Sequence, residues 1–245
     1  APVIGGQILL FASWRATFVL LTLVGVFLAG AALIYQETLP QEARSANMTD
    51  SLKIFPMLLR DRYFLGHCLL QCFVFGAFFS YLSGSSFVFQ NVYAVSPQVY
   101  SMIFAVIGAG LLLAGVLPAR LAGRVPDVVM LKYAVLVPLF GSILLLAGFC
   151  LSAPLAVILV VLFLTIVPLS VMGAASFSLA LSRQGKNAGS ASALIGCFSM
   201  LLGACMMPLV GIAGDHTAIP MGIVMLVGYG LGALVFYGMI SSDHL

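Results

Sequence analysis

The chain is a series of apolar stretches, most of them long enough to form a helix that crosses a lipid bilayer. Such a helix needs about 20 predominantly apolar residues. Hydrophobic residues make up 62% of the 245 residues and charged residues only 7%, a composition that a water-soluble domain of this length cannot carry. A signal peptide has one short apolar segment, and barrel strands are about 10 residues long with alternating polarity. The sequence therefore predicts an all-α polytopic membrane protein.

The apolar stretches predict one partial crossing followed by seven complete ones. The partial crossing covers Ala1 to Phe11. The complete crossings are predicted at Ala16 to Tyr35, Phe64 to Phe87, Tyr100 to Leu117, Val128 to Leu146, Pro154 to Leu181, Ala188 to Ala213 and Ile219 to Ile240. The long polar segment from Gln36 to Arg62 is interpreted as a linker between two membrane modules.

The basic residues predict the orientation of the chain in the membrane. Segments on the cytoplasmic side of a membrane protein collect Lys and Arg. If the linker is cytoplasmic, the outer segments hold only Arg15 of the ten basic residues. The inner segments then hold Arg44, Lys53, Arg60, Arg62, Arg120, Arg124, Lys132, Arg183 and Lys186. We therefore expect a cytoplasmic linker and a cytoplasmic C-terminus.

The acidic residues lie in the predicted loops or at the ends of the spans. They are Glu37, Glu42, Asp50, Asp61, Asp127, Asp215 and Asp243. A carboxylate in the middle of a membrane helix is costly and usually marks a proton or counter-ion site. His67 is expected to be an interfacial residue at the cytoplasmic end of its span rather than a proton relay. We therefore expect no proton-coupling group within these spans.

Several stretches resemble a family of transporters. "APVIGG" at the start of the chain is similar to the end of the antiporter motif G-x-x-x-G-P-x-x-G-G, which Pro2, Gly5 and Gly6 match. Further likeness lies in "SWRATF", "ETLP", "SGSSFVFQNVYAVSPQVYSMIFA" and "AGSASALIG". Together these stretches resemble drug:proton antiporters of the major facilitator superfamily, in particular the bicyclomycin-resistance (Bcr/CflA) subfamily. The general cytoplasmic-loop motif of the superfamily is degraded here, at "LPARLAGRVPD".

The resemblance implies two six-helix halves with a substrate cavity between them at mid-membrane. Residues 1–35 would then be the end of the N-terminal half, residues 36–62 the central cytoplasmic linker, and residues 63–245 the C-terminal six-helix bundle. It also implies a protein of the bacterial cytoplasmic membrane that exports drugs in exchange for protons. Its partners would be the drug, protons, the lipid bilayer and the missing N-terminal half of the same polypeptide. No cofactor and no nucleic acid are expected.

Two sets of residues are candidates for function. Gly189, Ser192, Gly196, Ser199 and Gly203 recur at steps of three and four and so share one helical face. A small-residue face allows close helix packing in lipid, and it could also serve as a sliding surface. A second face carries Gln71, Phe75 and Phe78, which would suit a flat, partly polar drug, although such aromatic residues can equally pack against helices or lipid.

Four sites in the sequence predict bends in the helices. "SGSS" at Ser83 to Ser86 is a point at which a very long span could bend or unwind. Pro138, Pro168 and Pro208 lie within three other spans and remove backbone donors there. We expect a kink at each proline and leave open whether any of them acts as a hinge.

Other functions are less consistent with the sequence. A symporter or facilitator for a metabolite on the same fold is the main alternative, and a passive scaffold is another. An intramembrane serine hydrolase would need a base near "SGSS", but His67 lies about sixteen residues away along the helix, roughly 24 Å. His67, Cys68, Gln71 and Cys72 cluster without acidic partners, so we expect no metal site. No catalytic residues are predicted.

Overall fold

The computed structural model describes residues 2–35, 48–212, 214 and 216–241. Predictions that fall on Ala1, residues 36–47, Ala213, Asp215 and Asp243 lie outside these residues. The described part of the chain is helical throughout, with turns and short loops between the helices. The prediction of an all-α protein is therefore confirmed.

Seven helical segments of the described chain are long and apolar enough to cross a membrane. They are α2 (Trp14–Ile34), α4 (Arg62–Phe87) with η2 (Val88–Val92), α5 (Pro97–Gly115) with α6 (Leu117–Leu121), α7 (Asp127–Cys150), α8 (Leu155–Ile166) with α9 (Pro168–Ser182), α10 (Ala188–Val210), and α11 (Ile219–Val235) with η4 (Phe236–Ile240). These segments match the seven complete crossings predicted from the sequence. The partial crossing forms α1 (Pro2–Phe11).

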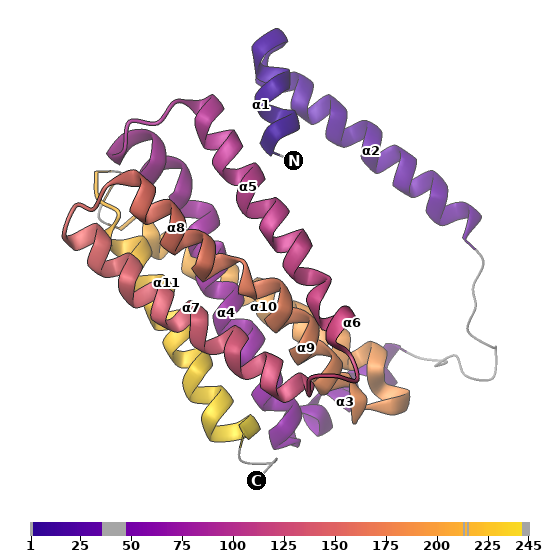
Figure 1. The fold of residues 1–245 in the computed structure, drawn as a ribbon. Helices are drawn as coiled ribbons and strands as arrows, with labels where there is room; N and C mark the ends of the chain where they lie inside the picture. The colour runs from indigo at the N-terminus through magenta and orange to yellow at the C-terminus, as the bar shows by residue number, and fades with distance from the viewer. Residues whose placement is uncertain (1, 36–47, 213, 215, 242–245) are drawn as a thin grey trace.

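Six of these segments pack into one bundle, and α4 is its central helix (Figure 1). Helix α4 lies mainly against α10 and α11, while α7 packs against α11, α8 and α9. Close approach to α4 depends on small residues: a Cβ added at Gly228 of α11 would lie 2.9 Å from the Cβ of Ala77 and from the backbone oxygen of Phe73. Small residues are the main device for tight helix packing in lipid, where hydrophobicity gives little drive for association.

Some of the polar side chains buried along α4 form hydrogen bonds, either within the helix or with a neighbouring helix. The hydroxyl of Ser80 donates to the carbonyl of Gly76 at 2.9 Å. The hydroxyls of Ser85 and Tyr100 lie 3.0 Å apart and form a hydrogen bond between α4 and α5. The Ser85 hydroxyl thus has a partner on a neighbouring helix, which a helix surrounded by lipid would lack.

Helix α4 does not unwind at "SGSS", contrary to one of the two outcomes expected there. It runs through Ser83 to Ser86 and then widens into the π-helical turn η2, where the N–H of Tyr93 donates to the carbonyl of Val88. Gly84 is enclosed by α10 and α11, since an added Cβ would lie 2.8 Å from Met221 Sδ and from Val210 Cγ1. The surrounding packing holds the Gly-Ser stretch in a helical conformation.

The three prolines have different effects on their spans. Pro168 coincides with a break, because α8 ends at Ile166 and α9 begins at Pro168. Helices α7 and α10 are continuous at Pro138 and Pro208. A proline that is the first residue of a new helix loses no internal hydrogen bond, which explains why the break lies at Pro168.

The predicted linker contains a helix that the sequence analysis missed, α3 (Met48–Arg60). Its side chain Leu58 is 1% exposed and belongs to a cluster with Phe64 of α4 and with Ala191 and Leu194 of α10. Ile54, Phe55 and Leu59 pack against the same cluster. This spacing of apolar residues is that of an amphipathic helix. The described end of the linker is therefore docked on the bundle.

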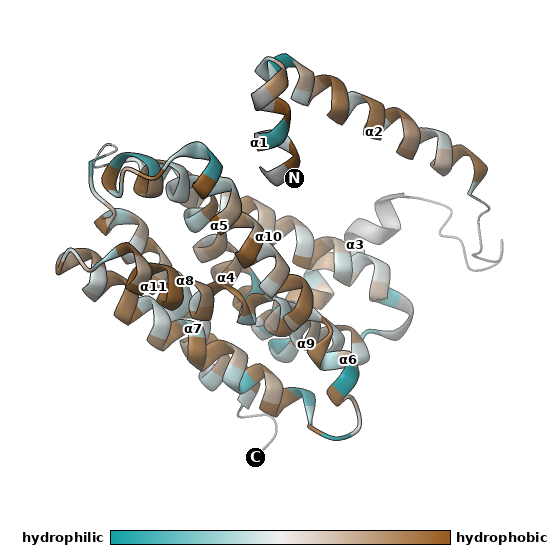
Figure 2. Cartoon of the chain, turned by 45° about the horizontal axis from the view of Figure 1, so that its top comes forward, coloured by the Kyte–Doolittle hydropathy of each residue, from teal (hydrophilic) through white to brown (hydrophobic). Residues whose placement is uncertain are grey.

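Helices α1 and α2 stand apart from the centre of the bundle (Figure 1). Helix α1 contacts α5 and α2. Helix α2 has no buried residue, and large apolar side chains such as Phe27 and Leu33 are 75% and 88% exposed. Figure 2 shows that α2 is mostly hydrophobic along its length. Such a surface is stable in contact with lipid tails or with another apolar helix.

Candidate functional site

A pocket of about 370 Å³ opens between α4, α9 and α10. It is lined by Gln71, Phe75, Gly173, Ala174, Phe177, Ser192, Ile195, Gly196, Ser199 and Met200. The two sequence-predicted sets therefore meet here, since Gln71 and Phe75 come from the aromatic face and Ser192, Gly196 and Ser199 from the small-residue face. The sequence predicted the two faces separately and did not predict that they share a pocket.

Gln71 is the polar group of the pocket with an unused hydrogen-bonding atom. The residue is 4% exposed, and its amide nitrogen Nε2 is buried without a hydrogen-bond partner in the part of the chain that the structure describes. An unsatisfied buried polar atom costs about 1–3 kcal/mol. Such an atom beside a pocket is a candidate for contact with a bound molecule, because a ligand acceptor could supply the missing bond after a rotation of the side chain.

The aromatic residues predicted on α4 have two different roles. Phe75 lines the pocket and is partly buried. Phe78 does not line it, and its ring packs instead against Tyr81, with ring centroids 6.0 Å apart. Tyr81 in turn stacks on Phe104 of α5 at 5.7 Å. Within the described chain, Phe78 is therefore part of the aromatic packing between α4 and α5.

The small-residue face of α10 divides into a closed and an open part. At Gly203 an added Cβ would collide with the ring of Phe79, so this residue lies at a close contact with α4. Gly189 and Gly196 have no atom within 4 Å of an added Cβ. Among the described residues, Gly189 and Gly196 therefore make no close helix contact of the kind seen at Gly203, and their role in helix packing stays a prediction.

Helix α9 supplies pocket residues that the sequence analysis missed. Gly173, Ala174 and Phe177 lie on one face of this helix. Phe177 is 38% exposed and presents a second aromatic ring to the pocket. The spacing of Gly173 and Phe177 was a usable signal, but nothing in the sequence indicates that α9 lies beside α4.

A buried polar pair lies one helical turn from the pocket. Nδ1 of His67 is 2.9 Å from Oγ of Ser176, and both residues are fully buried. His67 is therefore covered by α9, and its position at the membrane interface stays a prediction. His67 precedes Gln71 by four residues on α4, and Ser176 is the neighbour of Phe177 on α9, so this bond joins two of the three helices that form the pocket walls.

A polar network at the helix ends also joins α4 to α9. Asp61 caps α4 by accepting from the N–H groups of Tyr63 and Phe64, and it accepts from Nε2 of Gln184 at 3.0 Å. The guanidinium of Arg183 lies over the Tyr63 ring, 3.8 Å from its centre. These charge-assisted contacts fix the position of α4 relative to the end of α9.

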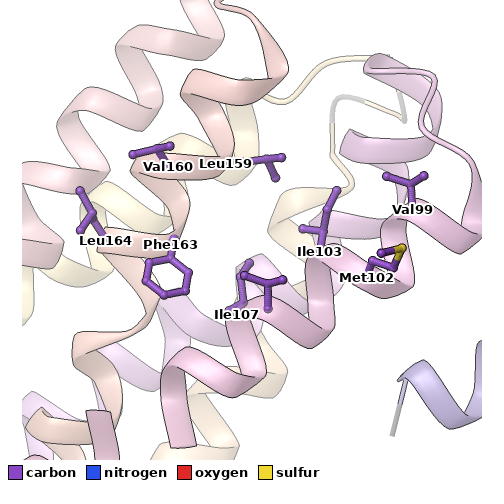
Figure 3. A pocket seen from close by; sticks show the side chains of 9 residues that line it. Val99, Met102, Ile103, Ile107, Leu159, Val160, Phe163 and Leu164 are labelled. Atoms are coloured by element: carbon purple, nitrogen blue, oxygen red, sulfur yellow. The ribbon is translucent and has the colours of Figure 1, made fainter. Parts of the chain in front are cut away.

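A larger groove of about 670 Å³ lies between α5 and α8 and is lined by apolar side chains alone. Figure 3 shows Ile103 and Ile107 of α5 opposite Leu159 and Phe163 of α8. The helices meet at Gly110, where an added Cβ would lie 2.7 Å from the Phe163 ring. This groove offers no hydrogen-bonding side chain, so it can accept only hydrocarbon.

A third pocket, of about 490 Å³, lies at the end of the bundle near the α7–α8 turn, with His216, Thr217 and Ser152 in its lining. Tyr93 also lines it and donates its hydroxyl to the carbonyl of Ala153 at 3.2 Å. Burial raises the pKa of the Tyr93 phenol, so it remains a donor at neutral pH.

The remaining predicted residues lie away from the first pocket. Gly5 of the antiporter motif is in α1 with Pro2 and Gly6, and no atom lies within 4 Å of a Cβ added at Gly5. Cys72 donates its thiol to the carbonyl of Phe198 at 3.2 Å. The part of the chain that the structure describes contains no group of three or more His, Cys, Asp or Glu side chains placed to bind a metal.

Residues 1–208 match the family model described as Major Facilitator Superfamily. The chain belongs to the major facilitator superfamily. The resemblance to this superfamily that the sequence predicted is therefore confirmed.

Two relatives of this superfamily chain are informative. It is 38% identical over 243 residues to the uncharacterized MFS-type transporter YdgK of Bacillus subtilis, a match that covers 98% of this chain and 60% of the relative. It is 27% identical over 247 residues to a bicyclomycin resistance protein homolog of Haemophilus influenzae, covering 99% of this chain and 62% of that protein. The chain spans about three fifths of the length of these relatives.

Proposed function

We propose that the full-length protein exports drugs and other small amphipathic molecules across the bacterial cytoplasmic membrane in exchange for protons. This chain would contribute the C-terminal six-helix bundle (residues 63–245), the central linker (residues 36–62) and the end of the N-terminal half (residues 1–35). The name of the Haemophilus influenzae relative supports export of an antibiotic, and the antiporter-like residues Pro2, Gly5 and Gly6 support exchange rather than uptake.

The pocket of Gln71 and Phe75 is the observation that carries this proposal. It combines two aromatic rings with a few hydroxyl and amide groups, which is the composition of sites that bind flat, partly polar molecules. It also opens on the side of α10 that carries Gly196, where a Cβ added to this residue would have no atom of the described chain within 4 Å. We propose that the N-terminal half faces this surface and completes the cavity, as alternating access between two halves requires.

We propose that the proton-coupling carboxylate lies in the part of the protein outside this chain. Among the described residues, Asp61 and Asp127 lie at the starts of α4 and α7, at the ends of spans. Proton exchange at physiological pH needs a titratable group of suitable pKa within the membrane. Collapse of the pH gradient with a protonophore should therefore stop export by the full-length protein, and this chain alone should not couple transport to protons.

The orientation is part of the same proposal: the linker and the C-terminus face the cytoplasm. Cys150 is exposed at the end of α7 and would then face outward, whereas a cysteine placed at the exposed Ala122, between α6 and α7, would face inward. In intact cells an impermeant maleimide should label Cys150, with Cys150→Ser as control, and should not label Ala122→Cys. The opposite pattern would overturn the orientation.

The test of function is drug export by the full-length protein and its variants. Gln71→Ala and Phe75→Ala should change the relative resistance to structurally different antibiotics more than they change the amount of folded protein. Phe140→Ala, at a 61% exposed position on α7 outside the pocket, is the matched control. A loss that is the same for every antibiotic and follows the amount of folded protein would contradict the proposal.

A further inference from the structure

The polar groups of the pocket indicate what kind of molecule it selects. Its described lining contains the amide of Gln71 and the hydroxyls of Ser192 and Ser199, and no Asp, Glu, Lys, Arg or His. The Ser199 hydroxyl already donates to the carbonyl of Ile195 at 2.8 Å. The Gln71 amide and the Ser192 hydroxyl are therefore the side-chain groups left to bond a ligand, and of the two only the amide is buried.

Because the Gln71 amide is buried, binding of a ligand depends on whether the ligand can form a hydrogen bond with it. Its Nε2 atom has no hydrogen-bond partner among the described residues, and only 4% of the residue is exposed. A ligand with a carbonyl or similar acceptor would satisfy the amide, whereas a pure hydrocarbon would leave it unpaired. Sites with buried polar groups discriminate most strongly against analogues that lack the complementary group.

The same surroundings disfavour a charged ligand. An ion that enters an apolar pocket loses its hydration, and it needs an opposite charge to recover that free energy. The described lining offers no carboxylate. The rings of Phe75 and Phe177 can contact a flat aromatic body through their faces or edges, so the described walls suit an uncharged aromatic molecule better than a cation.

We infer that Gln71 makes this pocket selective for neutral, flat aromatic molecules that carry a carbonyl-type hydrogen-bond acceptor. The inference rests on the proposed function, because it assigns a substrate class to the same pocket. Gln71 donates to the acceptor of the ligand, while Phe75 and Phe177 hold its aromatic body.

Three probes of similar size separate the contributions: naphthylacetamide is neutral with a carbonyl acceptor, ethylnaphthalene has no acceptor, and naphthyltrimethylammonium is a permanent cation. Their binding to the purified full-length protein can be measured by naphthyl fluorescence. We expect naphthylacetamide to bind about tenfold more tightly than the other two, which corresponds to ~1.4 kcal/mol.

Gln71→Met tests the role of the amide, because methionine keeps the length of the side chain and removes its polar groups. Since the amide is unsatisfied in the structure, this variant should fold at least as well as the wild type. It should weaken binding of naphthylacetamide about tenfold and leave ethylnaphthalene unchanged or bound more tightly. Ser192→Ala is the second variant, and it should have a smaller effect on the same probe.

The outcomes distinguish the inference from the proposed function. If the wild-type protein exports antibiotics and binds all three probes equally, or if Gln71→Met weakens all three probes equally, the inference is wrong and the proposed function stands. If the wild-type protein neither exports antibiotics nor binds any probe, both are wrong.

Discussion

Helices α4 and α2 are both long enough to cross a membrane, yet they have opposite surroundings. Of the seven candidate spans, α4 with η2 is the least apolar and has the largest buried share, whereas α2 is among the most apolar and has no buried residue. In water the more apolar helix would be the buried one. In lipid an apolar surface costs nothing to expose, and polar groups are placed where other helices can bond to them.

A substitution at the contact between α11 and α4 should have the largest effect on the stability of the protein. Gly228→Leu would force a side chain into the space between α11 and the backbone of α4, where Phe73 O lies 2.9 Å from an added Cβ. Overpacking of this kind typically costs about 1–3 kcal/mol and more where backbone must move. We expect a marked fall in the yield of folded full-length protein and in its melting temperature, measured by fluorescence-detected gel filtration after heating.

Gly25→Leu in α2 is the matched control, because no atom lies within 4 Å of an added Cβ at Gly25. It should leave both quantities close to those of the wild type. If Gly25→Leu lowered the yield and the melting temperature as much as Gly228→Leu does, α2 would be packed as tightly as α4 in the full-length protein. That result would contradict the contrast drawn between the two helices.

Alanine substitutions in the two parts of the α10 small-residue face should differ in their effect on stability, but by less than the two leucine substitutions above. Gly203→Ala places a methyl group against the Phe79 ring of α4, and the ring must shift to accommodate it. We expect a loss of about 1–2 kcal/mol, seen as a lower melting temperature. Gly196→Ala, in the open part, should not lower it, since alanine is a better helix former than glycine. A reversed order would contradict the division of this face.

Loss of the buried hydrogen bond between α4 and α9 should have the smallest effect on stability of these three changes. His67→Leu and Ser176→Ala each remove one partner at 2.9 Å, and the double variant removes both. A double-mutant cycle on thermal stability should give a coupling of about 0.5–1.5 kcal/mol. Thr22→Ala in α2 removes a bond to the helix's own Phe18 carbonyl and should change stability by less. Additive effects at His67 and Ser176 would show that their bond contributes no stability.

The sequence predicted the number and approximate ends of the spans because chain length and apolar composition determine them. It did not predict α3, because the polar residues around it suggested a linker and its apolar stripe is short. The sequence also did not predict that His67 is buried between α4 and α9. Burial of His67 depends on Ser176, which is 109 residues away, and no local pattern shows that these two residues meet.

The site was predicted in pieces for the same reason. Gln71, Phe75 and Ser192 were each selected from the helical spacing on their own helix, and that spacing is a local property. Whether α4 and α10 turn those faces toward one cavity depends on packing between helices, and so does the contribution of Phe177 from α9. The same spacing selected Phe78, which packs against Tyr81.

The π-helical turns η2 and η4 determine where this chain can change its length. Elsewhere in a span, deletion of one residue rotates every later side chain by about 100° relative to its neighbours. Residues Val88–Val92 and Phe236–Ile240 already form wider turns with one residue more than an α-helical turn needs. A deletion there can be absorbed by return to the α-helical form, so alignments of related chains should place single-residue gaps at these two turns rather than within α4 or α11.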